Sequence, residues 1–176
     1  DMSETDIKIV TTLHGTDISI LGEDSTLISA IKYGMERSDV VTAVSNSLKE
    51  ETYEKIGTTK EIETIYNFVD EQIFKRRDPG NLKEQFGILP HERVIIHVSN
   101  FRKIKRLPNV VDAFFKVREH LPVKLLLVGD GPERRRINEY VKDHPFKKDI
   151  LFLGKQENIE ELFAISDLKL LLSEKE

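Results

Sequence analysis

Residues 93–106 read RVIIHVSNFRKIKR, and this stretch indicates the fold class. It begins as a nearly continuous apolar run, which is expected of a strand that is covered on both faces in a parallel sheet. It ends with four basic residues among the six that follow Ser-Asn. The chain as a whole is mildly acidic, with 27 Lys+Arg against 31 Asp+Glu, so the basic cluster is a local feature.

The same kind of strand alternates with helical patterns on both sides of this stretch. Strands are expected at 7–13, 40–44, 62–66, 93–99, 123–128, 150–154 and 168–172. Helices are expected at 25–38, 47–56, 110–121, 133–144 and 158–167. Ser47 and Glu50 predict a capping box for the second helix, and Gly57 its end. This alternation predicts an α/β protein with doubly wound parallel sheets.

The polar segment 70–92 interrupts the alternation with "DPG" and "LP" and predicts an interdomain linker. We therefore expect residues 1–69 to be the C-terminal part of one α/β domain and 93–176 to be most of a second. Since the chain begins and ends close to expected strands, we expect it to be a piece of a longer chain.

Composition excludes several classes of protein. Without cysteine, the chain has no disulfide scaffold, thiolate metal site or cysteine nucleophile, and a reducing cytoplasm is compatible with that. No apolar run approaches the ~20 residues of a membrane helix, and no signal peptide is visible. The net charge of -4 argues against a general binder of nucleic acid or membrane surfaces.

Ligands of doubly wound sheets bind beyond the carboxyl ends of the strands, and four motifs lie there. The basic residues of "SNFRKIKR", together with the N-terminus of the following helix, could bind a diphosphate. The alternative interpretation is a solvated loop of basic residues. "GDGPE" is a tight turn, with or without a ligand, and is not a dinucleotide fingerprint because Arg134 replaces the third glycine. In "HGTD", His14 is either a functional residue or a structural, exposed histidine. In "SEKE", the two carboxylates either serve the site together or form an exposed acidic end.

The remaining histidines do not suggest a metal site. His97 lies within an apolar strand and is expected to be a packed core residue, and no pair of histidines has metal-ligand spacing. No protein-held metal and no cofactor are therefore expected.

The order of several stretches resembles the retaining family 4 glycosyltransferases. "IETIYNFVDEQIF" is similar to the family's interdomain segment, with Asn67, Val69, Asp70 and Phe74 at the matching positions. "VSNFRKIKR", "LLLVGDGPE" and "LFLGKQENIEELFAISDLKLLLSEKE" are similar to successive parts of its donor half. The resemblance covers essentially the whole chain. It implies the GT-B fold, in which two Rossmann-like domains face a cleft and the second holds most of the nucleotide sugar.

The resemblance also implies roles for individual residues. Lys105 falls on the family's diphosphate lysine, and Asn100 on its arginine position, for which Arg102 is the candidate substitute. His14 and Glu176 fall on residues that contact the transferred sugar. The other implied positions are Gly129, Gly131, Lys155 and Gln156 beside the donor nucleotide, and Thr12 and Asn46 on the acceptor side.

Finer features of the same stretches imply transfer of N-acetylglucosamine from UDP-N-acetylglucosamine to L-malate with retention, the first step of bacillithiol biosynthesis. The alternatives are a family 4 enzyme with another donor or acceptor, and a non-catalytic nucleotide-binding module. Nucleic acid and membrane are not expected partners, and a homo-oligomer is left open. This chain alone is expected to be inactive, because the family's glycine-rich loop would precede it.

Overall fold

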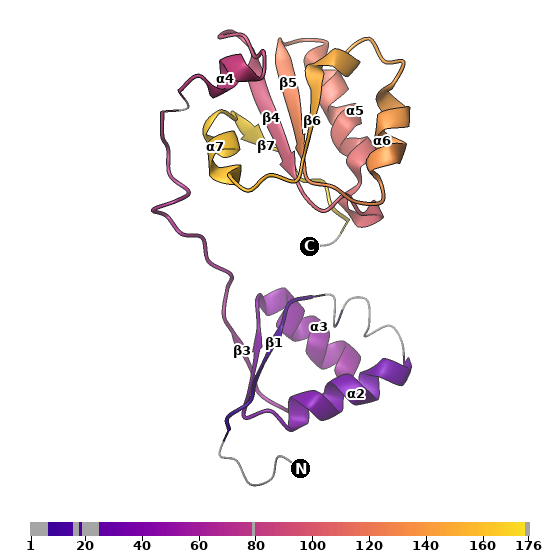
Figure 1. Ribbon diagram of the computed structural model, residues 1–176. Helices are drawn as coiled ribbons and strands as arrows, with labels where there is room; N and C mark the ends of the chain where they lie inside the picture. The colour runs from indigo at the N-terminus through magenta and orange to yellow at the C-terminus, as the bar shows by residue number, and fades with distance from the viewer. Residues whose placement is uncertain (1–6, 16–17, 19–24, 79, 175–176) are drawn as a thin grey trace. The chain divides into compact units, whose positions relative to one another are not determined.

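The computed structural model describes residues 7–15, 18, 25–78 and 80–174. The chain divides into two compact units, Asp1–Val69 and Asp70–Glu176 (Figure 1). Each unit has its own parallel sheet and its own buried core, so each is described by itself.

The first unit has a three-stranded parallel sheet in the order β1-β2-β3. Its elements are β1 (Val10–Leu13), α2 (Ser25–Glu36), β2 (Val40–Ala43), α3 (Asn46–Ile56) and β3 (Ile62–Thr64). The helices α2 and α3 pack against each other beside the sheet (Figure 1). Met35, Leu48 and Ile56 bring the apolar faces of these helices into the core of this unit.

The start of α3 corrects the predicted capping box. The N-cap is Ser45, whose extended backbone lets its side chain accept a hydrogen bond from the Leu48 amide at 3.1 Å. Ser47 already lies within the first turn of the helix, so the prediction that it caps was wrong. The predicted end is confirmed: Gly57 is left-handed, and its amide donates to the Tyr53 carbonyl.

The second unit has a four-stranded parallel sheet in the order β6-β5-β4-β7. Its strands are β4 (Arg93–Val98), β5 (Val123–Val128), β6 (Ile150–Gly154) and β7 (Leu168–Lys169). Its α-helices are α4 (Leu82–Gln85), α5 (Leu107–Arg118), α6 (Arg134–Val141) and α7 (Ile159–Ala164). The predicted α/β class with parallel sheets is thus confirmed. Helix α4 lies in the segment that the sequence left as a linker, and β7 is shorter than predicted.

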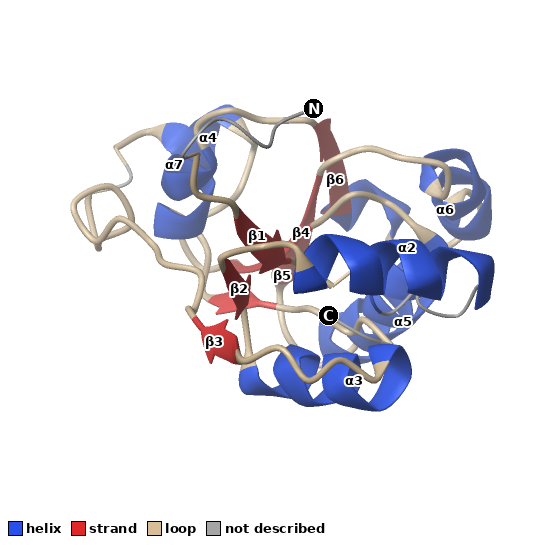
Figure 2. Ribbon diagram, turned by 90° about the horizontal axis from the view of Figure 1, so that it is seen from below, coloured by secondary structure: helices blue, strands red, loops and turns tan. Residues whose placement is uncertain are grey.

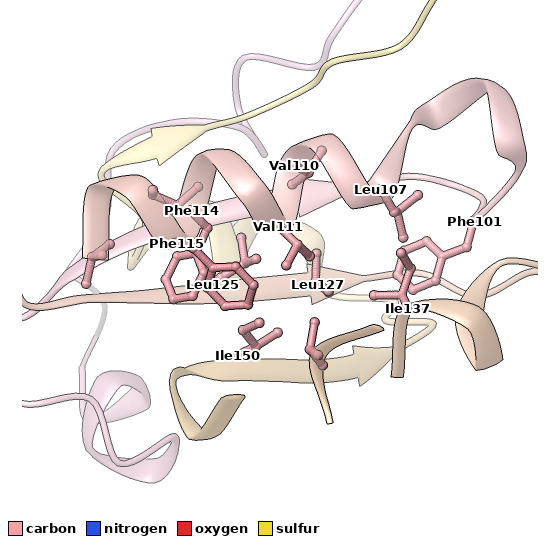
Figure 3. Packing of buried hydrophobic residues seen from close by; sticks show 13 residues of the cluster. Phe101, Leu107, Val110, Val111, Phe114, Phe115, Leu125, Leu127, Ile137 and Ile150 are labelled. Carbon is pink, nitrogen blue, oxygen red and sulfur yellow. The ribbon is translucent and has the colours of Figure 1, made fainter. Parts of the chain in front are cut away.

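Helices cover both faces of this second sheet. Ile95 faces the cluster formed with α5 and α6, whose packing is shown in Figure 3. Val94 and Ile96 face the opposite cluster, to which α4 and α7 contribute. In Figure 2 the helices are blue and the strands red. Because β4 is buried on both faces, its sequence reads as a continuous apolar run and not as an alternating one.

Candidate functional site

The carboxyl ends of the second unit's parallel strands lie at one edge of its sheet. The segments that leave this edge are 99–106 after β4, 129–133 after β5, 154–156 after β6 and 170–174 after β7. Three of the four motifs that the sequence places at strand ends therefore leave the same edge of the sheet.

The basic segment 99–106 is fixed to its neighbour by main-chain hydrogen bonds. The Phe101 amide donates to the Asp130 carbonyl, and the Glu133 amide donates to the Phe101 carbonyl, each at 2.9 Å. The Phe101 ring is fully buried in the core beneath α5 (Figure 3). An apolar anchor and paired backbone groups thus hold a charged loop in place.

Both glycines of "GDGPE" are required by this close packing. Gly129 has a φ of 121°, and a Cβ there would overlap the Ser99 carbonyl oxygen. Gly131 has a φ of 157°, and a Cβ would lie 2.8 Å from the Phe101 amide nitrogen and carbonyl oxygen. The sequence interpretation gave these glycines to the donor. The structure adds a packing reason, which is close contact with the backbone of the basic loop.

The cations of this loop differ in their surroundings. Lys103–Lys105 form a single 3-10 turn, and Arg106 follows it in the left-handed conformation with a φ of 49°. Lys105 is half-buried, whereas Arg102 and Lys103 are exposed. Helix α5 begins at Leu107, so the positive end of its dipole lies next to this turn. Pro108 has no amide hydrogen, and the Asn109 amide donates to the Arg106 carbonyl at 2.9 Å.

An open pocket of about 340 Å³ lies at the ends of β4, β5 and β6. Four of the predicted donor-binding residues line it, namely Asn100, Gly129, Lys155 and Gln156. Arg102, Lys105 and Gly131 are not among its lining residues. The strand ends form the apolar floor of this pocket, and polar groups lie at its margin.

The segment after β7 runs beside the basic turn. The Glu174 amide donates to the Ile104 carbonyl at 3.0 Å. Glu176, the predicted sugar-contacting carboxylate, lies outside the described residues.

The predicted residues of the first unit lie near the carboxyl ends of β1 and β2. His14 follows β1 and is exposed. Thr12 accepts a hydrogen bond from the Thr42 hydroxyl at 2.9 Å, and Asn46 donates to the Tyr66 hydroxyl at 3.1 Å. The partners of Thr12 and Asn46 thus belong to the first unit.

Sequence reasoning missed a charge cluster in the second unit. Asp149 accepts from Arg118 at 2.8 Å and from Lys124 at 2.6 Å, and Lys124 also lies 3.3 Å from Glu92. Burial alone would raise the pKa of Asp149, but the hydrogen bonds from Lys124 and Arg118 outweigh it and hold that pKa below its ordinary value. These charges come from segments far apart in sequence, so no local pattern could have revealed them.

His97 is buried, as the sequence predicts, but it is not an inert core residue. Its ring contacts the Leu170 carbonyl and the Ser99 hydroxyl. Among the described residues, no group of three or more His, Cys, Asp or Glu could hold a metal ion. In that part of the chain, no helix is both long and apolar enough to cross a membrane.

Two families match this chain in succession. Residues 2–73 match the family described as Glycosyltransferase Family 4, and residues 79–176 match Glycosyl transferases group 1. The second match alone includes more than half of the chain.

Individual relatives match over nearly all of the chain. It is 55% identical over 170 residues to the N-acetyl-alpha-D-glucosaminyl L-malate synthase of Bacillus anthracis. The aligned region covers 97% of this chain and 45% of that relative. An uncharacterised glycosyltransferase of Methanocaldococcus jannaschii is 26% identical over 172 residues, covering 90% of the chain and 44% of the relative. The chain thus spans about half the length of the curated relatives it matches.

Solved structures agree on the fold. Anabaena HepE in complex with UDP and glucose superposes with a TM-score of 0.81 at 24% identity, over 94% of this chain and 46% of that chain. WaaG, a glycosyltransferase involved in lipopolysaccharide biosynthesis, gives a TM-score of 0.75 at 12% identity, over 99% of this chain and 55% of that chain. The two units therefore make up part of a GT-B fold.

Proposed function

Because the chain belongs to the group 1 glycosyl transferases, we propose that its protein is an enzyme that moves N-acetylglucosamine from UDP-N-acetylglucosamine to L-malate with retention of anomeric configuration. The observation that carries this proposal is the 55% identity to the Bacillus anthracis synthase over 97% of the chain. We propose the cytoplasm as the location, with which the lack of cysteine is compatible.

The geometry of the second unit supports a donor site. In the proposed arrangement the base and ribose lie over the part of the pocket lined by Gly129, Lys155 and Gln156. The diphosphate lies toward Asn100, Arg102, Lys105 and the N-terminal end of α5, where the cations and the positive end of the helix dipole are.

In the reaction proposed, the bond from the anomeric carbon to the UDP oxygen breaks. A bond from that carbon to the malate hydroxyl oxygen forms on the same face, which preserves the configuration. The hydroxyl proton passes to a phosphate oxygen of the departing UDP. Negative charge grows on the diphosphate during this step, and Lys105 with the positive end of the α5 dipole stabilises it without a protein-held metal. His14 and Glu176 are the proposed contacts to the transferred sugar.

The test uses the protein at its full natural length, purified and incubated with UDP-N-acetylglucosamine and L-malate. We expect UDP and N-acetylglucosaminyl malate as products, with the α configuration seen by NMR. A parallel panel offers UDP-glucose as donor, because HepE was solved with UDP and glucose, and other hydroxy acids as acceptors.

Turnover with another pair and none with the proposed pair would show a different member of the family. Binding of UDP without turnover of any pair would support a non-catalytic nucleotide-binding module.

A further inference from the structure

The structure assigns a positioning role to His97, which ties together the two segments that carry the proposed donor contacts. This inference rests on the proposed function. His97 lies near the carboxyl end of β4, between β5 and β7 in the sheet, and has no exposed surface. Its neighbours along the same strand, Ile95 and Ile96, are ordinary apolar core residues. A polar ring at such a position is costly unless its nitrogens are hydrogen-bonded.

Both ring nitrogens have partners on different segments. Nδ1 lies 2.9 Å from the Leu170 carbonyl oxygen, and Nε2 lies 2.7 Å from the Ser99 hydroxyl oxygen. A carbonyl oxygen can only accept, so Nδ1 carries the hydrogen and donates it. In the neutral ring Nε2 then accepts from the Ser99 hydroxyl. The two contacts thus fix both the tautomer and the ring orientation.

Each partner begins a segment of the candidate site. Ser99 opens the loop that continues to Asn100, Arg102 and Lys105. Leu170 opens the segment after β7, whose paired residues end at Lys169. His97 holds the start of that segment through the Leu170 carbonyl, and the basic turn holds its far end through the Glu174 amide. Main-chain hydrogen bonds also hold both partners, from the Ser99 amide to the Val128 carbonyl and from the Leu170 amide to the Ile96 carbonyl. The ring of His97 adds a direct link between the start of the phosphate-side loop and the start of the segment after β7.

This arrangement predicts that donor binding weakens when the hydrogen bonds of the His97 ring are removed. Leucine at position 97 fills a similar volume and removes both hydrogen bonds. Asparagine can still present an N–H near the position of Nδ1 and so preserves the contact to Leu170. Ser99→Ala removes the partner of Nε2, and because Ser99 also lines the pocket its effect is compared with that of H97L. The matched control is Asp149→Asn, which breaks a buried ion pair of the same unit without touching either segment.

The experiment measures the Kd of UDP by calorimetry and the KM of both substrates, in the full-length protein and these four variants. For H97L we expect the Kd of UDP and the KM of UDP-N-acetylglucosamine to rise about tenfold, which is about threefold for each of the two hydrogen bonds lost, with the KM of malate unchanged. S99A should raise both donor constants about threefold, and H97N should stay within about threefold of wild type. D149N should lower the Tm and leave the Kd of UDP unchanged.

The outcomes separate this inference from the proposed function. If wild type binds UDP and H97L binds it equally well, the positioning role is wrong. If H97L does not fold, S99A and H97N still decide, because equal donor constants for wild type and S99A overturn the role. A 15N spectrum of the wild-type ring protonated only at Nε2 would also contradict it. If wild type binds no UDP, the proposed function fails and the donor role of His97 fails with it.

Discussion

Lys105 and Lys103 lie in the same 3-10 turn but differ in burial, and this difference makes a prediction at the scale of single residues. Lys105 is half-buried and lies where the end of β4 leads into α5, whereas Lys103 is exposed. Lys105→Ala in the full-length protein should lower kcat/KM roughly ten- to a thousand-fold, because a charge-assisted contact is strengthened as charge grows in the transition state. Lys103→Ala should have much less effect. Steady-state kinetics with UDP-N-acetylglucosamine measure both variants.

The contrast between the two lysines carries this prediction. A general electrostatic effect of the basic loop would reduce activity in both variants by similar amounts. A strong effect in Lys103→Ala, or wild-type kinetics in both folded variants, would contradict the phosphate role of Lys105.

Gly129 gives a second prediction, on stability. Its φ of 121° and the overlap of a Cβ with the Ser99 carbonyl oxygen leave no room for a side chain. Gly129→Ala should lower the free energy of unfolding by at least about 2 kcal/mol. Gly87 is the control in the same unit, since its φ is 64° and a Cβ would meet nothing within 4 Å. Gly87→Ala should cost about 1 kcal/mol, from the left-handed backbone alone. Equal losses in urea unfolding would show that contact with the basic loop is unimportant.

At the scale of elements, the sequence predicts helices and strands well because each has a local apolar period. The positions of β4, β5 and β6 follow from their apolar runs, and the end of α3 follows from Gly57. The cap of α3 was misplaced because Ser47 with Glu50 matches the capping-box sequence, whereas Ser45 caps through its own extended backbone without a Glu three residues later. The predicted strand at 168–172 was longer than β7, because an apolar run cannot show where pairing with β4 stops.

The charge cluster around Asp149 joins α5, β5 and the turn before β6, and it predicts how stability depends on pH. The pKa of Asp149 in the folded protein lies below the ordinary value. The contribution of Asp149 to stability is therefore present above a pH of about 3.9 and is lost as the pH falls through the folded pKa. Asp149→Asn should lower the free energy of unfolding by about 2–4 kcal/mol at neutral pH, since Lys124 and Arg118 lose a buried partner.

Urea unfolding of wild type and Asp149→Asn between about pH 7 and pH 3 measures this effect. The stability difference between the two proteins should shrink as the pH falls. A difference that stays constant over this range would contradict the ionic role of Asp149.

At the scale of the whole molecule, the sequence indicated the parallel α/β architecture and which strand ends face one edge. Asn100, Gly129, Lys155 and Gln156 lie together there because parallel strands end on the same side of a sheet. The role of His97 could not be predicted, because it depends on contacts to Leu170, which is distant in sequence. The packing reason for Gly129 likewise requires the position of the Ser99 carbonyl in space.

The central claim is that UDP binds at the carboxyl edge of the second unit's sheet. Amide hydrogen exchange of the full-length protein, with and without saturating UDP, tests it most directly. We predict slower exchange in 99–106, 129–131 and 154–156, because bound UDP would cover these loops and hold their hydrogen bonds closed. Segment 143–149, which leads to β6 at the opposite edge of the same sheet, should exchange at the same rate with and without UDP. Unchanged exchange across 99–106 at saturating UDP would contradict the claim.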